Sequence, residues 1–549
     1  MQRTLRVEES LDLSSAATGL PSRAAPAPRT RLLSVGVLAI LLGVLTATTL
    51  VACYYAIVVP QQLDEGEPVI YGLATRLVQH QPLYQPTDRP PFIEAYYTPL
   101  YFYAVAELRA HFGPGFGPGR ALSLVMGVLA AALLAYITAS RARSWWAGGF
   151  AALLFVGLGF PLAPAPFLAL ERVDMLGVAF SIAAVAVLAN RTSWVHLLLA
   201  GVCAGLAVLT KQSLFAAALA GTAWLATLSR PRAVLFAASA ALTVLIPALV
   251  LQWSTRGAFW DNIGPANLTP TSLTFGAYLL REAAVIQGVP TLLAAAYVIG
   301  SRAWRHPTLR LIVCYWLASM ISVAGIAKMG ANHNYWIELA AANAVLVALG
   351  IGTATRRRSR AIHAVVSMLP IWLLAAHLAV LTPARLIDER SFDVIPLSWT
   401  LRAEQFSHLA NEAPEFNNLV RDVSGEKGAV LSESMDIAVL GDQPLQIEPF
   451  AFSMLEAQGR WSSEPLLDQI CAGKITLLVL SYPIDKVPAL GDYPAWPRSV
   501  AAALHQAMQF EQIRAFHWLY RSRPAPEPAA IARCKVQAAS ARVASASDD

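Results

Sequence analysis

The chain has 549 residues, of which 56% are hydrophobic and only 14% are charged. A soluble chain carries nearer a quarter charged residues. Here the apolar residues also gather in runs of about twenty, the length that crosses a hydrocarbon core. Composition therefore excludes an ordinary soluble enzyme and predicts a polytopic α-helical membrane protein. The net charge of +6 does not indicate nucleic-acid binding, because the basic residues lie mostly in short loops between apolar runs.

The first 31 residues are basic and rich in Pro, Ala and Ser, which predicts a disordered cytoplasmic leader. The first apolar run follows over 32–59. It is too long for the apolar core of a cleavable signal peptide, so we expect it to stay in the membrane as an anchor.

A long non-spanning segment follows over 60–119 and forms the first outer loop. Within it, apolar residues recur at helical spacing over 67–80, which indicates an amphipathic helix lying in the membrane interface. A second helix, over 99–112, carries two charged residues and is too short to cross. With this helix lying flat, the basic pairs and runs between later spans all fall on the cytoplasmic side, as the positive-inside rule prefers.

The remaining apolar runs bring the total to about eleven transmembrane helices, with the N-terminus inside and the C-terminus outside. Six outer segments then share one side of the membrane, among them the first outer loop and everything after the last span. The predicted spans after the first are 120–140, 145–163, 174–190, 194–210, 212–229, 233–252, 285–301, 309–327, 336–354 and 361–381.

Residues 382–521 are predicted to form a small extracytoplasmic α/β domain, periplasmic in a bacterium. The stretches 428–432 and 475–480 are typical of buried strands, and 465–470 is typical of a helix. Residues 522–549 are rich in Ala, Ser and Pro, which predicts a disordered tail. Cys471 and Cys534 could form a disulfide if this part of the chain lies in an oxidising compartment.

Three carboxylates stand close together directly after the first span, in the stretch Leu63-Asp64-Glu65-Gly66-Glu67. Acidic residues favour the first turn of a helix, and this explains Glu67 at least as well as a function would. A carboxylate facing water at the membrane surface can also act as a base or bind a metal. We therefore take Asp64 and Glu65 as candidate catalytic residues, which could also ligate a divalent metal; no other cofactor is indicated.

Other polar residues gather at the outer ends of the spans, where they are costly and hence functional candidates. Each has a structural alternative. Arg172 and Asp174 could form a local ion pair, Lys211 could snorkel to the headgroups, and aromatic residues could belong to an interfacial belt. The candidate substrate-binding residues are Tyr97, Arg120, Arg172, Asp174, Lys211, Gln212, His333, Asn334 and Tyr335.

The sequence contains no Walker A loop, no His-Glu-x-x-His motif and no Cys-x-x-Cys pair. ATP-driven transport and zinc-protease chemistry therefore have no support.

In order along the chain, several motifs resemble those of a known family. They are Asp64-Glu65, Gln81-Pro82-Leu83-Tyr84, Tyr97-Thr98-Pro99-Leu100-Tyr101, Arg120-Ala121-Leu122-Ser123, Arg172-x-Asp174 and the stretch from Gly205 to Gln212. Together, over residues 32–350, the chain resembles bacterial GT-C-fold glycosyltransferases of the protein-mannosyltransferase-like type.

This resemblance implies an enzyme of the bacterial inner (plasma) membrane. It would use a polyprenyl-phosphate-linked sugar as donor and a protein, lipid or glycan as acceptor, reached from the outer side. In such enzymes an acidic residue of the first outer loop deprotonates the acceptor, giving inversion at the sugar. Asp64 matches that position, and Lys211 and Arg172 are candidates to stabilise the leaving phosphate.

Two other classes of function stay open at this point. A membrane transporter or lipid flippase would also need many spans and outward-facing polar residues. Against it, the two halves show no repeat of short, broken spans, and the charges cluster at one face instead of at mid-bilayer. A non-catalytic envelope-assembly protein would use the C-terminal domain as its working part.

Overall fold

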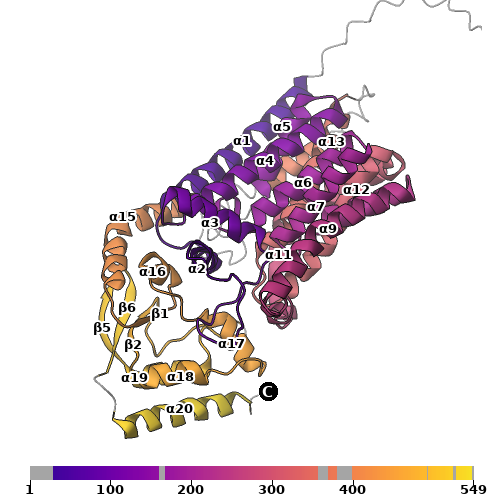
Figure 1. Ribbon diagram of the computed structural model, residues 1–549. Coiled ribbons are helices and arrows are strands. Elements are labelled where there is room, and N and C mark those ends of the chain that lie inside the picture. Colours follow the sequence, from indigo (N-terminus) through magenta and orange to yellow (C-terminus); the bar gives the residue numbers. More distant parts are fainter. Residues whose placement is uncertain are drawn as a thin grey trace, which may run out of the picture.

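The computed structural model describes residues 29–159, 167–356, 369–379, 399–490, 493–523 and 527–546. Most of the predicted leader over 1–31, and the segment 382–398 at the start of the predicted C-terminal domain, lie outside these ranges. The described chain has two parts, a helical bundle and a smaller domain that contains a sheet, with the first outer loop between them (Figure 1).

The bundle is built from apolar helices that correspond one to one with the predicted spans. Among the described residues, six helices are long and apolar enough to cross a membrane, and five more are apolar but shorter. The polytopic helical class is thereby confirmed, whereas eleven crossings stay a prediction. The helices are α1 (Arg29–Val58), α4 (Gly117–Ala142), α5 (Trp145–Leu158), α6 (Asp174–Asn190), α7 (Trp194–Thr210), α8 (Ala216–Ala226), α9 (Arg230–Ser254), α11 (Leu273–Ser301), α12 (Pro307–Val323), α13 (Ile337–Arg356) and a helix over Leu369–Ala379.

Short elements close one end of the bundle. The predicted interfacial helices of the first outer loop are present as α2 (Gly66–Val78) and α3 (Leu100–Phe112). The first half of α2 is buried all round, between α3 and α16 of the C-terminal domain, and its position in the membrane interface stays a prediction. The other short elements are η1 (Phe167–Ala169), α10 (Ala258–Ile263), η2 (Pro265–Asn267), η3 (Ala303–Arg305), η4 (Ala324–Ala327) and η5 (His333–Trp336).

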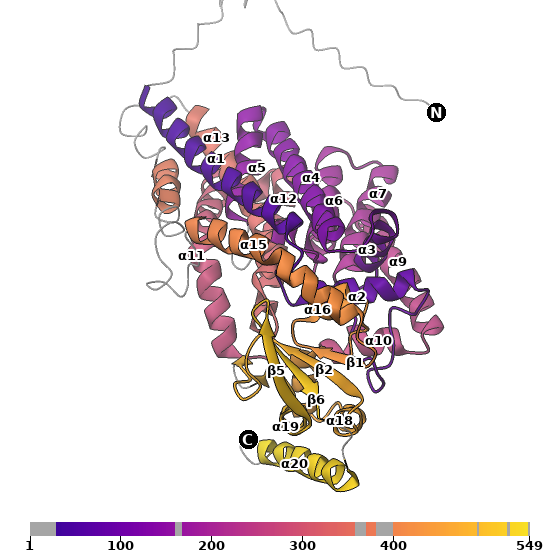
Figure 2. The same ribbon diagram turned by 90° about the vertical axis from the view of Figure 1, so that its left-hand side faces the viewer.

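The C-terminal domain is a four-stranded mixed sheet with helices on both faces (Figure 2). Its strand order is β1-β2-β6-β5, with β1 parallel to β2 and the other pairs antiparallel. From Leu477 to Leu480, successive residues of β2 enter the two cores in turn, since successive side chains of a strand point to opposite faces. The elements are α15 (Trp399–Ser424), β1 (Ala429–Ser432), α16 (Met435–Leu440), α17 (Pro449–Ala457), α18 (Glu464–Cys471), β2 (Ile475–Leu480), β3 (Ala489–Leu490), β4 (Tyr493–Pro494), α19 (Arg498–Ala507), β5 (Met508–Arg514), β6 (His517–Ser522) and α20 (Pro528–Ala546).

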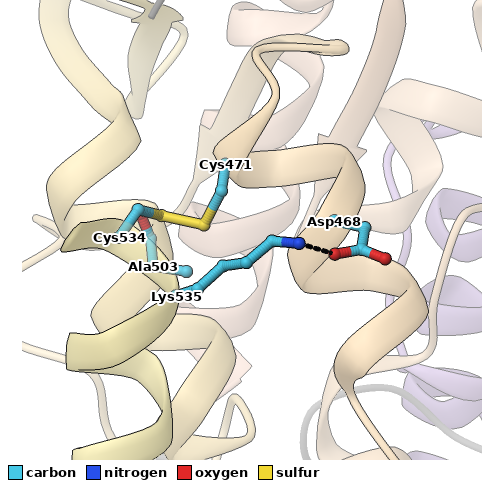
Figure 3. Close-up of a disulfide and its surroundings, with 5 residues drawn as sticks. All are labelled: Asp468, Cys471, Ala503, Cys534 and Lys535. Atoms are coloured by element: carbon cyan, nitrogen blue, oxygen red, sulfur yellow. Dashed lines mark hydrogen bonds and ion pairs between the residues drawn. A yellow bond between two sulfur atoms is a disulfide. The ribbon is translucent and has the colours of Figure 1, made fainter. Parts of the chain in front are cut away.

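The structure differs from the expected disorder over 522–549, because α20 forms a helix that packs on α18 and α19. Cys534 of α20 is joined to Cys471 of α18 by a disulfide, with Cα atoms 5.8 Å apart (Figure 3). Lys535 also pairs with Asp468 of α18. Ala538 is fully buried beside the disulfide, so a small side chain allows close helix packing rather than marking disorder.

The C-terminal domain is docked on the first outer loop through backbone and side-chain hydrogen bonds. The amide of Phe92 donates to the carbonyl of Gln446 (2.8 Å), and the amide of Glu448 donates to the carbonyl of Phe92 (2.9 Å). Closer to the first span, the amide of Gln62 donates to the buried carboxylate of Asp436 (2.8 Å). The two parts of the chain therefore meet beside the acidic stretch that follows α1.

Candidate functional site

A cavity of about 910 Å³ lies where the predicted outer segments meet. Its wall includes residues of the first outer loop, the segment before α6, the turn after α7, the segment around η2 and α11, the connection between α12 and α13, and the C-terminal domain. The sequence predicts that these segments share one side of the membrane, and the structure brings them to one end of the bundle. Of the candidate residues, Asp64, Glu65, Tyr97, Arg172, Lys211, Gln212, His333, Asn334 and Tyr335 line this cavity.

Asp64 is held in an ion pair with Arg172 at the start of α2. Its Oδ1 accepts from Nη1 of Arg172 (2.8 Å) and from the amide of Gly66 (2.9 Å). Within the described part of the chain, Oδ2 has no hydrogen bond and is left for another donor. Arg172 also donates from Nη2 to the hydroxyl of Tyr97 (3.0 Å). Burial acts to lower the pKa of Arg172, but Asp64 and Tyr97 outweigh it and raise the pKa above its ordinary value.

Gly66 is required at this corner by the close approach of Arg172. A Cβ atom at this position would lie 1.4 Å from Nη1 of Arg172. Any larger residue would push the guanidinium away from Asp64. Asp64 thus supplies the carboxylate, and the missing side chain of Gly66 leaves room for the Arg172 guanidinium that pairs with it.

Arg120 does not line the cavity, so its prediction as a substrate-binding residue was wrong. It is fully buried at the start of α4 and forms a bidentate ion pair with Glu67 (2.8 and 2.6 Å). It also donates to the carbonyl oxygens of Ala56, Val59 and Gln61. Arg120 thus ties the end of α1 to the first turn of α2, which fixes the position of Asp64.

Lys211 and Asp174 form a second buried ion pair, at 2.7 Å. Asp174 itself is 1% exposed and stands behind the cavity wall. The ammonium of Lys211 lies over the ring of Tyr335, 5.0 Å from its centroid, which is a cation–π contact. Lys211 therefore faces the cavity with its charge largely compensated. Next to it, Gln212 donates from Nε2 to the carbonyl of Tyr96 (2.7 Å).

The connection between α12 and α13 supplies further polar groups. The imidazole of His333 pairs with the carboxylate of Glu282 on α11, and the buried Oδ1 of Asn334 has no hydrogen-bond partner in the described chain. Lys328 bonds to the side chain of Asn267. No acidic partner of Lys328 occurs among the described residues. Burial, reinforced by the positive charge of Lys211, lowers the pKa of Lys328 to about 8.

Sequence reasoning missed two carboxylates that line the cavity, Glu94 and Glu448. Glu94 lies in an otherwise apolar stretch, which was the available signal. Nothing in the local sequence around Glu448 marks it. Burial raises the pKa of Glu94 to about 7, and burial together with Glu94 raises the pKa of Glu448 to about 8. Burial and the adjacent Asp64 also raise the pKa of Glu65.

The described residues do not fit the divalent metal that we considered for Asp64 and Glu65. They include no group of three or more His, Cys, Asp or Glu side chains arranged to hold an ion. Oδ1 of Asp64 already accepts from a guanidinium and an amide, which leaves it poorly suited to a cation. We therefore derive no chemical step through a metal.

A polytopic helical bundle with two short helices at one end, and a cavity between the bundle and a small α/β domain, defines the class of fold. Comparison with solved structures identifies it as the GT-C fold, as predicted. The chain is similar to ArnT from Cupriavidus metallidurans bound to undecaprenyl phosphate, with a TM-score of 0.55 and 13% identity over 89% of this chain and 100% of that one. The apo form of ArnT gives a TM-score of 0.54 and 13% identity, over 87% and 97% of the two chains.

A weaker likeness, with a TM-score of 0.48 and 13% identity, joins the chain to an Archaeoglobus fulgidus oligosaccharyltransferase over 82% of this chain and 70% of that one. No protein-family model and no curated protein sequence matches the chain. At 13% identity, the similarity to ArnT shows a shared fold.

Proposed function

We propose that the protein is an integral-membrane glycosyltransferase that moves a sugar from a polyprenyl-phosphate donor to an acceptor on the extracytoplasmic side. The observation that carries this proposal is that one cavity holds both a carboxylate with an unbonded oxygen and a cation without an acidic partner, as judged over the residues that the structure describes. Asp64 supplies the first and Lys328 the second. The similar fold of ArnT, which binds undecaprenyl phosphate, supports the choice of donor.

Lys328 is the best phosphate ligand in this arrangement. Arg172 and Lys211, which we expected to hold the phosphate, each already pair with a carboxylate. Their charges are largely compensated, so they serve mainly to orient Asp64 and to shape the wall. The ammonium of Lys328 would stabilise the negative charge that develops on the leaving phosphate.

Asp64 is the proposed base. Its Oδ2 would accept the proton of the acceptor hydroxyl while the hydroxyl oxygen forms a bond to the anomeric carbon of the sugar. The bond between that carbon and the phosphate oxygen breaks, and its electron pair leaves with the polyprenyl phosphate. This direct displacement inverts the configuration at the sugar. A positioned carboxylate base contributes roughly 10²–10⁴-fold to such a step.

The disulfide supports placement of the C-terminal domain outside the cytoplasm, since disulfides persist in oxidising compartments. In a bacterium this would be the periplasmic face of the inner membrane. The cavity would then open toward an acceptor at that face. The position of the charged residues, at one end of the bundle, also favours transfer over transport, for which charges near mid-bilayer are expected.

The test compares envelope glycans, by mass spectrometry, from cells that produce the wild-type chain, Asp64→Asn or Asp88→Asn. Asp88 is an exposed acid of the same outer loop and serves as the matched control. We expect D64N to lose the transferred sugar at wild-type protein levels, and D88N to keep it. If D64N still transfers the sugar, Asp64 is not the base. If cells that lack the protein have the same envelope glycans as wild-type cells, the proposal of a glycosyltransferase is refuted.

A further inference from the structure

A second group of polar side chains on the cavity wall takes no part in the proposed transfer step. It consists of Glu94, Tyr96, Gln212 and Glu448, which all line the cavity. Glu94 is 1% exposed, yet both of its carboxylate oxygens lack a hydrogen bond of acceptable geometry in the described structure. The Tyr96 hydroxyl lies within hydrogen-bonding reach of both Glu94 and Glu448, whereas Oε1 of Gln212 and Oε2 of Glu448 have no partner of acceptable geometry in the described structure. Buried polar atoms are normally fully bonded, so this part of the wall retains capacity for further hydrogen bonds with a molecule in the cavity.

Two distant parts of the chain build this group. Glu94 and Tyr96 belong to the first outer loop, and Glu448 precedes α17 of the C-terminal domain. The backbone bonds between Phe92 and residues 446 and 448 hold the two segments side by side. Phe450, in the first turn of α17, adds an aromatic ring to the same wall.

The charge of the group suits a neutral ligand that both donates and accepts hydrogen bonds. Burial raises the pKa of both carboxyls, and the nearby Glu94 raises that of Glu448 further, because like charges disfavour a second charge nearby. With pKa values of about 7 and 8, the pair holds at least part of a proton at neutral pH. It therefore offers donor and acceptor atoms together. The charged or titratable groups that act on the pair are Tyr96, Glu65, Arg172 and Arg460.

The position of the group relates it to the proposed reaction. Glu448 is close enough to Glu65 and Arg172 for their charges to affect it, which places the group beside the Asp64–Arg172 pair. A phosphate would be repelled there by the carboxylates. Sugar hydroxyls, in contrast, can donate to carboxylate and amide oxygens and accept from a phenol or a protonated carboxyl.

Resting on the proposed function, we propose that Glu94, Tyr96, Gln212 and Glu448 form the subsite for the sugar of the donor. The polyhydroxylated ring would lie on this wall, beside the base, with its phosphate directed toward Lys328. The C-terminal domain then supplies part of the substrate-binding site through Glu448.

The test measures binding of two kinds of probe by the full chain in nanodiscs. The probes are undecaprenyl phosphate and a panel of undecaprenyl-phosphate-linked hexoses and pentoses. We expect the wild-type chain to bind at least one sugar-bearing lipid more tightly than the bare carrier. Glu448→Ala should remove this gain, roughly tenfold to a hundredfold for lost charged hydrogen bonds, and leave affinity for undecaprenyl phosphate unchanged.

Glu94→Gln changes the group from the side of the first outer loop and is nearly isosteric. It should also reduce affinity for the sugar-bearing lipid and leave affinity for undecaprenyl phosphate unchanged. Glu464→Gln, an exposed acid at the start of α18, is the matched control and should bind like the wild type. Melting temperatures establish that each variant is folded. Equal affinity of wild type for all probes, or an equal loss for both kinds of probe in both variants, would overturn the sugar subsite. Failure of the wild type to bind undecaprenyl phosphate would instead overturn the proposed function on which it rests.

Discussion

Replacement of Arg120 by Met should destabilise the protein strongly without removing a substrate contact. Arg120 is fully buried and makes five hydrogen bonds, two to the Glu67 carboxylate and three to backbone carbonyls. Met approximates its length but carries no charge. In R120M the Glu67 carboxylate keeps only the amides of Leu63 and Glu171, both at 2.8 Å.

The magnitude follows from the burial of both partners, whose side chains are 0% exposed. Breaking a buried pair by removal of one partner costs about 3–5 kcal/mol, or about two to four powers of ten in the unfolding equilibrium constant. Replacing both charges is often close to neutral. The double variant Arg120→Met/Glu67→Gln should therefore be more stable than R120M alone.

The assay is denaturant and thermal unfolding of the full chain in detergent, with undecaprenyl phosphate binding measured below the melting range. We expect R120M to melt earlier and the double variant to recover part of the loss. Folded R120M should bind undecaprenyl phosphate with nearly wild-type affinity. Unchanged stability in R120M, or a double variant less stable than R120M, would refute this reasoning; a selective loss of binding would restore Arg120 as a substrate ligand.

Three further predictions concern the cavity and the C-terminal domain. Gly66→Ala should displace the Arg172 guanidinium, so envelope-glycan transfer should fall while the melting temperature stays near wild type; unchanged transfer would contradict this. Because the pKa of Glu448 is raised from 4.5 to about 8, its contribution to stability is complete below pH 4.5 and lost as pH rises through about 8. Glu448→Gln should thus flatten the decline of melting temperature between about pH 4.5 and pH 8, and parallel curves would contradict it. Removing the Cys471–Cys534 disulfide, which spans 63 residues, should cost about 4 kcal/mol and expose α20 to limited proteolysis, whereas an unchanged cleavage pattern would not fit.

The helices were predictable because each is an apolar run of the right length, a property of local sequence. The two short helices of the first outer loop followed from the amphipathic spacing and from the length of the second apolar stretch, whereas their flat position in the membrane interface stays a prediction. Asp64, Arg172 and Lys211 were found because charged side chains at the ends of apolar runs are costly unless used. The structure confirms that these three line one cavity.

What the sequence did not reveal depends on contacts between distant segments. Polarity at a helix start cannot distinguish a charge that faces substrate from one that is neutralised internally, and this is why Arg120 was misassigned. Glu448 joins the cavity only through the docking of the C-terminal domain. Over Pro528–Ala546, an Ala- and Ser-rich composition indicated disorder, yet the disulfide and the packing of Ala538 stabilise a helix.

The extended segment 92–97 serves two hydrophobic cores at once. Phe92 and Tyr96 pack toward the C-terminal domain, whereas Ile93, Ala95 and Tyr97 pack toward the helices of the outer loop. Since the two sides alternate residue by residue, inserting or deleting one amino acid here would exchange them. The length of this short segment is therefore fixed by the two cores that it joins.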